Sequence, residues 1–589
     1  MSYKRSMPIC FSAITKENIH EYLDMLKKCK ADRVFICGLN YIYLKTTELY
    51  TETERIREII SYFKNNGLEV GIWVDAFGHG GPLVGYEGDV KGSYTLIEGI
   101  DGRCAHTICP SDEKFVADYS EGIKRIASLS PDLIMLDDDF RVNGRISYYL
   151  GCFCENHLKK FRLLVGEEVA REDIERLITT GGKNKYRDAY LDMIADMLLG
   201  FAKKLRKAVD EVNPNIRLGA SSPLEGWDLS GTSLIEIAKA FAGNTKPFAR
   251  IAGAPYWDNN VIAVSEAARL QFNYGKDKGV ELFAEGDTYP RPRYNVASKG
   301  LETFEAIMIA DGGGDGVLSY IFDYNQTPSY EPGYVTRFIK NEDRRLKIIE
   351  MAKNGKPVGV RVLNVAEKMR DFDMPKEVKK YSIRFFEELR SFTPGAKILS
   401  KNSIPTCFED SGYPVLVFGE NAKHVCVSDL KNGAILDIRS ADILQKRGID
   451  VGLVSFEPKA FSSEYYVKND DEILAVTHPH TQKISVSENA KVETYFKPDN
   501  TPASYRYENA NGQKFFVMAF DYFNFDGDFN ANYICSYYRQ EQLEDAIYYL
   551  SGKTLPAFIK KNPNLYNLCK KDENGNLFVM LANVSIDDV

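Results

Sequence analysis

The sequence lacks any long apolar run: no stretch approaches the roughly 18–20 residues that a membrane span needs. The N-terminal segment is basic but has no apolar core and no small-residue cleavage site, so it does not resemble a signal peptide. An excess of positive charge is missing as well, because 83 Asp and Glu outnumber 75 Lys and Arg, for a net charge of −8. A nucleic-acid binder normally presents a basic face, so we expect neither a nucleic-acid partner nor membrane association.

A disulfide framework is also missing. The 11 cysteines are odd in number and scattered through 589 residues, a pattern typical of reduced thiols and of metal sites, so we expect a cytoplasmic protein. Internal repeats and low-complexity tracts are absent. What remains is ordinary for a large globular chain, with 44% hydrophobic and 27% charged residues, and the length predicts more than one domain.

The first 350 residues alternate short apolar runs with amphipathic helical patterns. Continuous apolar runs are typical of parallel strands that are buried on both faces. Eight such strands are expected, over 8–13, 33–39, 68–77, 132–140, 216–222, 248–254, 280–285 and 316–322. Eight strands alternating with helices predict the α/β class and a (β/α)8 TIM barrel. An open doubly wound sheet is the alternative, but no glycine-rich phosphate loop follows the first strand.

The pattern changes after the barrel segment. We expect the catalytic barrel over 1–352 and a smaller α/β domain with a β-rich insertion over 353–500. The remainder of the α/β domain and the start of a C-terminal β-domain are expected over 501–589, and we expect the chain to end inside that last domain.

Carboxylates at two strand ends are candidate catalytic groups, because barrel active sites gather at the carboxyl ends of the strands. Strand four ends in three adjacent aspartates, 137–139, which raise one another's pKa as a general acid requires. The simpler interpretation is a helix cap or a cation site. Strand seven ends in Glu285, a candidate nucleophile or else a salt-bridge partner of Arg291 or Arg293.

Strands four and seven lie nearly opposite in an eight-stranded ring, so their end groups can flank one bond. Retaining glycosidases need two carboxyl groups roughly 5–5.5 Å apart, one as acid/base and one as nucleophile. The sequence therefore predicts Asp139 and Glu285 as this pair, with Asp138 beside them.

Further polar and aromatic residues follow the predicted strands and are candidate substrate contacts. A lone Trp is more often core packing, but two of only three Trp at strand ends favour stacking on a sugar. The candidates are Trp73, Asp75, His79, His106, Tyr256, Trp257, Asp258, Asp287 and Tyr289.

Four soft metal ligands follow two neighbouring strands. Cys109 comes after strand three, and Cys152, Cys154 and His157 come after strand four. Such a set on adjacent loops suits a closed tetrahedral zinc, although cysteine is often simply buried. We expect a structural zinc that fixes the loops around the site, and no organic cofactor.

A family resemblance rests on the cysteine segment. The run CFCENHLKKFRLLVG, from Cys152 onward, resembles the C-Y-C-x-x-C-x-x-x-F-R-x-W-L segment of the family 42 glycoside hydrolases, the β-galactosidases. In that family the segment follows the catalytic Asn-Glu of strand four and binds zinc together with a Cys-Pro after strand three. The resemblance implies that Cys109, Cys152 and Cys154 bind zinc, with His157 in place of the family's fourth cysteine.

The resemblance extends beyond the metal segment. Glu285 matches the family's nucleophile position, and DGGGDGVLSYIFDY resembles the segment that leads into the eighth strand. Family 42 enzymes continue with an amidotransferase-like α/β domain, which helps to build a trimer, and then a β-domain. GAILDIRSADILQKRGIDVGL is similar to part of that middle domain. The resemblance implies a carbohydrate substrate and a homo-oligomer, with a trimer favoured.

Two departures from the family concern substrate choice. Asp138-Asp139 stands where the family has Asn-Glu, and His106 replaces an Arg three residues before the zinc cysteine. Adjacent acids at the end of strand four also resemble hexosaminidases, including the O-GlcNAcase-like family, in which the 2-acetamido group of the substrate is the nucleophile. In that alternative Asp138 orients the amide, Asp139 is the general acid and Glu285 only contacts the substrate.

The favoured hypothesis is a retaining exo-glycoside hydrolase of β-linked sugars. Glu285 attacks the anomeric carbon, and Asp139 protonates the leaving oxygen and then activates water. The alternatives are a β-N-acetylhexosaminidase with substrate-assisted catalysis through Asp138 and Asp139, and a non-catalytic carbohydrate-binding barrel, which the fold alone does not exclude.

Overall fold

The computed structural model describes residues 3–77, 93–137, 140–142, 150–223, 230–256, 261–288, 297–365, 368–373, 394–466, 468, 471–474, 481–521 and 534–584. The chain forms two compact units. The first comprises Met1–Trp257, Gln271–Ile348 and Met369–Arg390, and the second comprises Asp258–Leu270, Ile349–Lys368 and Ser391–Val589.

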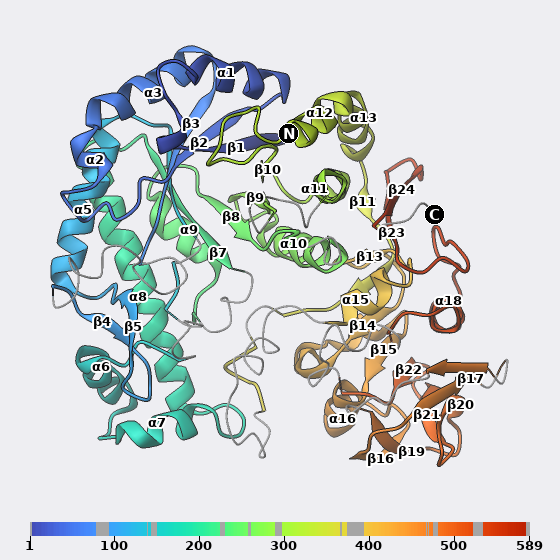
Figure 1. Ribbon diagram of the computed structural model, residues 1–589. Helices are drawn as coiled ribbons and strands as arrows, with labels where there is room; N and C mark the ends of the chain where they lie inside the picture. Colours follow the sequence, from blue (N-terminus) through green and yellow to red (C-terminus); the bar gives the residue numbers. More distant parts are fainter. Residues whose placement is uncertain are drawn as a thin grey trace. The chain divides into compact units, whose positions relative to one another are not determined.

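Eight parallel strands close into a barrel in the first unit, in the order β1-β10-β9-β8-β7-β6-β3-β2 (Figure 1). The strands are β1 (Lys4–Cys10), β2 (Arg33–Cys37), β3 (Glu69–Val74), β6 (Leu133–Leu136), β7 (Arg217–Pro223), β8 (Phe248–Ala252), β9 (Glu281–Gly286) and β10 (Gly316–Ser319). Each falls within or overlaps a predicted strand. The TIM barrel is therefore confirmed, and the closure between β1 and β10 excludes the open doubly wound sheet.

Helices surround the barrel strands (Figure 1). Their apolar faces pack inward because buried residues recur at helical spacing, as Ile56, Ile59, Ile60 and Phe63 do in α3. The helices of this part are α1 (Ile19–Lys28), α2 (Glu48–Thr51), α3 (Thr53–Asn65), α5 (Glu113–Ser128), α6 (Glu155–Val165), α7 (Arg171–Ile178), α8 (Lys185–Asp210), α9 (Leu234–Ala242), α11 (Ser298–Asp311) and α12 (Pro332–Lys340), with a 3-10 helix η1 (Phe11–Ala13). Two more helices, α10 (Val261–Gly275) and α13 (Glu342–Ala352), are divided between the two units. A hairpin of β4 (Leu96–Glu98) and β5 (Cys104–Ile108) follows β3.

The amino end of the barrel is closed by an ion network, here called the floor network, of Arg33, Glu69, Arg217 and Glu281. Each of the four is the first residue of its strand. The Glu281 carboxylate lies 2.7 Å from Nη2 of Arg33 and 2.9 Å from Nη1 of Arg217, and Arg33 also donates to Glu69 at 2.9 Å. Buried charges are tolerated when they are paired, and closure of the barrel brings these four strand ends together. The ion pairs therefore form only in the closed barrel and stabilise it.

An aromatic layer lies directly above the floor network. Phe283 stacks on Phe35 and on Phe248, with ring centroids 6.1 and 6.2 Å apart. The guanidinium of Arg33 lies over both Phe35 and Phe283, and that of Arg217 lies over Phe248. The rings therefore fill the barrel and offer their electron-rich faces to the cations below.

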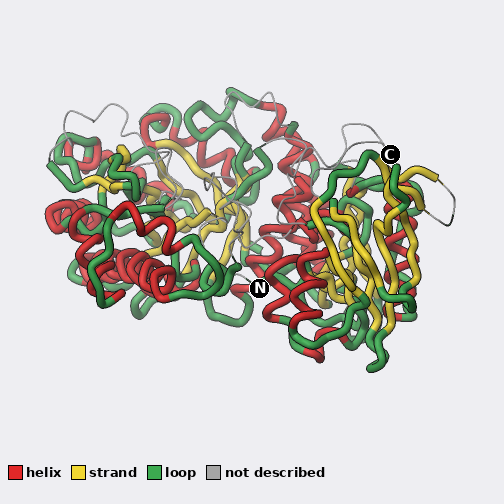
Figure 2. Tube along the Cα trace, turned by 90° about the horizontal axis from the view of Figure 1, so that it is seen from below, coloured by secondary structure: helices red, strands yellow, loops and turns green. Residues whose placement is uncertain are grey.

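The second unit is built around a nine-stranded mixed sheet in the order β13-β12-β14-β15-β22-β21-β20-β17-β18. Figure 2 shows strands of the protein in yellow and helices in red. The strands from β13 to β22 are parallel and those from β22 to β18 are antiparallel. A three-stranded sheet β11-β23-β24 and the pair β16-β19 accompany it. The predicted smaller α/β region and β-rich region after the barrel are thus both present.

The strands of the second unit are β11 (Lys356–Pro357), β12 (Val360–Val362), β13 (Thr406–Cys407), β14 (Val415–Val417), β15 (Ala434–Asp437), β16 (Leu453–Pro458), β17 (Ser463–Tyr466), β18 (Asp471–Leu474), β19 (Gln482–Val486), β20 (Lys491–Lys497), β21 (Thr501–Glu508), β22 (Lys514–Met518), β23 (Leu565–Lys571) and β24 (Leu577–Asn583). Its helices are α15 (Pro394–Ser400), η4 (Gly419–His424), η5 (Val427–Leu430), α16 (Ile438–Lys446) and α18 (Tyr537–Ser551). Among the described residues, no helix is both long and apolar enough to cross a membrane.

Candidate active site and metal centre

Glu285 lies at the carboxyl end of β9 and is the central carboxylate of the candidate site. Its side chain is buried, with 4% of its surface exposed. One carboxylate oxygen accepts a hydrogen bond of 2.9 Å from the backbone N–H of Gly253, and the other lies 3.4 Å from Nη2 of Arg250. Gly253 has a φ of 114°, which side-chain-bearing residues rarely adopt, so a glycine suits this donor position.

Arg250, in the middle of β8, joins side chains from several barrel strands. Its Nε donates to Ser221 Oγ at 2.9 Å and its Nη1 to the Tyr320 hydroxyl at 3.4 Å. Its Nη2 lies 3.3 Å from a carboxylate oxygen of Asp137, which follows β6. The guanidinium also lies over the Trp73 ring, 5.0 Å from its centroid. A single cation therefore bonds the end of strand four to the end of strand seven.

Aromatic side chains surround this cation. Tyr320 makes an edge contact with Trp73 at 6.3 Å, and the half-buried Tyr324 lies 6.3 Å from Trp73 and 5.5 Å from Tyr320. Burial, outweighing the nearby Arg250, raises the pKa of Tyr320 well above its ordinary value, so its hydroxyl stays protonated. The predicted sugar platform Trp73 thus packs one face on Arg250.

Two other predicted contact residues accept hydrogen bonds from backbone amides. The buried carboxylate of Asp75 accepts a 2.7 Å hydrogen bond from the backbone N–H of Tyr41. Asp287, two residues beyond Glu285, accepts from the backbone N–H of Thr288 at 2.6 Å. Both carboxylates therefore order loops at the carboxyl end of the barrel.

Of the other predicted residues, the structure describes Tyr256 and the backbone of His106. Tyr256 is half-buried in the segment after β8, and the backbone of His106 lies in β5. The predicted residues outside the described part of the chain are His79, Asp138, Asp139, Trp257, Asp258 and Tyr289, together with Arg291 and Arg293.

The sequence prediction did not include Arg250, Tyr320 or Tyr324. Arg250 interrupts the apolar run FARIAGA, and a charge inside a barrel strand needs a buried partner; that interruption was the available signal. Tyr320 and Tyr324 follow β10 in a segment with many aromatic residues, where nothing in the pattern separates a site residue from a core residue.

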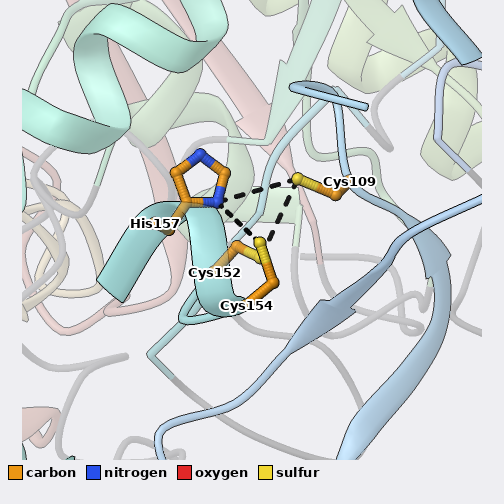
Figure 3. Close-up of side chains that lie close together, drawn as sticks. All are labelled: Cys109, Cys152, Cys154 and His157. Carbon is orange, nitrogen blue, oxygen red and sulfur yellow. Dashed lines mark hydrogen bonds between the residues drawn. The ribbon is translucent and has the colours of Figure 1, made fainter. Parts of the chain in front are cut away.

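The four predicted metal ligands come together in a buried cluster, with their ligand atoms all within 4.8 Å of one another (Figure 3). The Nδ1 atom of His157 lies 3.3 Å from Sγ of Cys154 and 3.7 Å from Sγ of Cys109. The sulfurs of Cys109 and Cys152 are 3.9 Å apart. Zn–S bonds of about 2.3 Å in a tetrahedron imply sulfurs about 3.8 Å apart, so the donor set and its spacing fit zinc.

Two segments far apart in the sequence are joined to form this cluster. Phe153 donates its backbone N–H to the carbonyl of Glu98 in β4 at 2.7 Å, and Arg171 pairs with Glu98 and donates to the Phe153 carbonyl. Cys109, just after β5, donates its N–H to the carbonyl of Thr95 at 2.8 Å. The hairpin is thereby held against the loop that carries Cys152 and Cys154.

Hydrogen bonding within the cluster shifts the pKa values of the thiols in different directions. Hydrogen bonds with Cys109 and Cys152 lower the pKa of Cys154, whereas hydrogen bonds with Cys152 and Cys154 raise the pKa of Cys109 well above its ordinary value. Burial raises the pKa of Cys152 to about 12. On the far side of the imidazole, Nε2 of His157 lies 3.1 Å from the Ser111 hydroxyl. Such an outer contact orients a ligating histidine.

No family model and no curated protein sequence matches the chain. Its fold does match solved structures. A β-galactosidase from Bacillus circulans sp. alkalophilus aligns with a TM-score of 0.63 at 13% identity, over 99% of this chain and 93% of that one. Gan42B, a GH42 β-galactosidase from G. stearothermophilus, aligns with 0.63 at 12% identity, again over 99% and 93%.

A third structure shares the arrangement less closely. The exo-β-1,4-mannosidase Op5Man5 from Opitutaceae bacterium strain TAV5 aligns with a TM-score of 0.50 at 11% identity, over 95% of this chain and 97% of that one. The likeness covers both units, and at these identities it establishes the fold: a TIM barrel followed by the further domains that family 42 structures carry. The expected architecture is thus confirmed.

Proposed function

We propose that the protein is a retaining exo-glycoside hydrolase acting on β-linked sugars, similar to the family 42 β-galactosidases. The observation that carries the proposal is Glu285, a buried and ion-paired carboxylate at the carboxyl end of the seventh strand of a closed barrel. The fold shared with two β-galactosidases and a β-mannosidase supports a β-glycosidase.

The proposed reaction proceeds in two displacements. A carboxylate oxygen of Glu285 forms a bond to the anomeric carbon while the glycosidic C–O bond breaks, and Asp139 transfers its proton to the leaving oxygen. Asp139 then removes a proton from water, which attacks the same carbon and releases Glu285. Ground-state contacts of Glu285 with Arg250 and Gly253 favour its ionised form, as a nucleophile requires.

The contacts of Asp137 support the choice of a later aspartate as the acid. Its carboxylate is ion-paired with the buried Arg250, which favours the ionised form. An acid catalyst must carry a proton at working pH. Asp137 is therefore unsuited to that role, and the proposal assigns it to Asp139.

A panel of nitrophenyl glycosides tests the proposal. We expect turnover of one or more β-linked sugars with retention of anomeric configuration, followed by NMR of the first product. A 2-fluoro glycoside of the same sugar is expected to inactivate the enzyme and to label the peptide that contains Glu285. Turnover confined to 2-acetamido sugars, with inhibition by a thiazoline, would instead assign substrate-assisted catalysis by Asp138 and Asp139. Binding without turnover would assign a carbohydrate-binding barrel.

We propose that the cluster of Cys109, Cys152, Cys154 and His157 holds a structural zinc. A closed four-ligand site has no position for substrate, so the metal would stabilise the joined loops. Metal analysis is expected to give one zinc per chain, and Cys154→Ser is expected to lose it. Stability should fall by about 3–4 kcal/mol, the linkage for a metal present at 100 to 1,000 times its dissociation constant.

Cys104→Ser is the matched control for the zinc prediction, because Cys104 is exposed on the same hairpin. It is expected to keep both metal and stability. A wild type that contains no metal and is as stable as Cys154→Ser would contradict the zinc assignment. The trimer and the cytoplasmic location remain predictions from the sequence.

A further inference from the structure

We propose that Arg250 is the positioning residue of the active site, a role that rests on the proposed function of Glu285. Arg250 holds the carboxylate of Glu285 ionised and aimed into the barrel, and it fixes the spacing between the ends of strands four and seven.

The contacts of Arg250 exceed what neutralising one carboxylate needs. Its side chain is 1% exposed, and its Nη2 lies 3.3 Å from Asp137 and 3.4 Å from Glu285. The bond from Nε to Ser221 fixes the plane of the guanidinium, and Trp73 covers one face of it. A planar, multidentate cation can satisfy these directions together, whereas a lysine ammonium acts as a point charge.

The position of Arg250 in the barrel makes it a link between strands. In the strand register Arg250 lies beside Ser221 on β7 and beside Phe283 on β9. Phe283 is the inward-facing residue just before Glu285 on the same strand, so Arg250 lies one such position below Glu285. Asp137 follows β6, and Tyr320 follows β10. Arg250 therefore lies beneath the position where a sugar would meet Glu285. Without Arg250, the Glu285 carboxylate would lose its charge partner and the link that fixes its distance from the end of strand four.

The experiment compares wild type, Arg250→Gln and Arg250→Lys with the control Arg33→Lys. Arg33 is as deeply buried on the same barrel and is also paired with carboxylates, but at the amino end. Rates are normalised to folded active sites by titration with the 2-fluoro glycoside. We expect Arg250→Gln to lower kcat by roughly 10²-fold, the loss typical of a misplaced reacting group, with little change in KM.

The pH profile separates positioning from mere structural support. Arg250→Gln is expected to move the acidic limb of kcat/KM to higher pH by about one to three units, because an opposite charge favours the ionised carboxylate by that amount. Arg250→Lys should keep the acidic limb of kcat/KM at its wild-type pH but should still have a lowered kcat. Arg33→Lys should change thermal stability and leave both the limb and kcat per active site unchanged.

Two further arms keep the proposal testable. Ser221→Ala removes only the Nε anchor, so it spares the fold and is expected to lower kcat severalfold. Calorimetric binding of isofagomine, a cationic iminosugar, reports on the Glu285 carboxylate without turnover, and Arg250→Gln should weaken this binding at least tenfold.

If wild type binds isofagomine but hydrolyses no glycoside, the proposed function fails, while a weaker binding by Arg250→Gln still upholds the positioning role. An unchanged kcat in Arg250→Lys and Ser221→Ala, together with an unchanged pH limb and isofagomine affinity in Arg250→Gln, would overturn the positioning role. A wild type that neither hydrolyses nor binds would overturn both proposals.

Discussion

Glu285→Gln is expected to lower kcat for the preferred nitrophenyl glycoside by about 10⁴- to 10⁶-fold, the range seen when a nucleophile acting within a catalytic unit is removed. The amide is nearly the same size as the carboxylate and still accepts the backbone hydrogen bond from Gly253. It has no anionic oxygen to bond the anomeric carbon, so the covalent intermediate cannot form.

The smaller variant Glu285→Ala gives an independent check on the same step. It leaves space beside Gly253 in which an added azide ion can attack the anomeric carbon from the nucleophile's side. Azide is expected to restore turnover and to give a glycosyl azide of inverted configuration. A fall of less than tenfold in Glu285→Gln, with 2-fluoro labelling unchanged, would remove Glu285 from the nucleophilic role.

Glu281→Gln in the floor network is expected to destabilise the protein by about 3–5 kcal/mol at pH 7, the cost of removing one partner from a buried ion pair. Among the described residues, Arg33 then keeps only its pairing with Glu69. Burial alone would raise the pKa of Glu281, but Arg33 and Arg217 outweigh it and lower the pKa to about 2. A fall of that size from the ordinary value corresponds to about 3 kcal/mol of linked stability, in agreement with the mutational range.

The sign of this shift determines the pH dependence. A carboxylate whose pKa is lowered by folding contributes stability that is fully present above its unfolded pKa, near 4.3, and is lost as pH falls toward 2. The difference in unfolding free energy between wild type and Glu281→Gln should therefore shrink from pH 5 to pH 2.5. Urea unfolding of the barrel transition at each pH measures it.

Glu58→Gln is the control for the floor network. Glu58 is an exposed carboxylate 3.8 Å from Lys16, and such surface pairs contribute roughly 0–1 kcal/mol. Its variant should match wild type at every pH. A difference for Glu281→Gln that stays constant between pH 5 and pH 2.5 would contradict the ion-network account.

The barrel could be predicted from the sequence because its strands are locally encoded. Each is a short apolar run between helical patterns, and the strand limits differ from prediction mostly at the carboxyl ends, where most observed strands stop earlier than predicted. The cysteine cluster was predictable for a similar reason, since Cys109 and Cys152 follow strands that are neighbours in any such barrel.

The ionic partners could not be predicted in the same way. Arg33 and Glu281 lie 248 positions apart, and only closure of the ring brings them together. Arg250 is likewise visible as a charge within an apolar strand, yet its partners Asp137 and Glu285 follow from strand order and register. In the second unit, β22 joins the parallel side of the sheet beside β15, a pairing that no local pattern announces.

The aromatic layer of Phe35, Phe248 and Phe283 separates two groups of buried charges in the barrel. The cations below it belong to the floor network, and the cation above it belongs to the carboxylates of the site. Substitutions in groups that share no partner tend to combine additively. The floor network can thus stabilise the fold, while substitutions around Arg250 can change the acids, the aromatic contacts and the preferred sugar of the site.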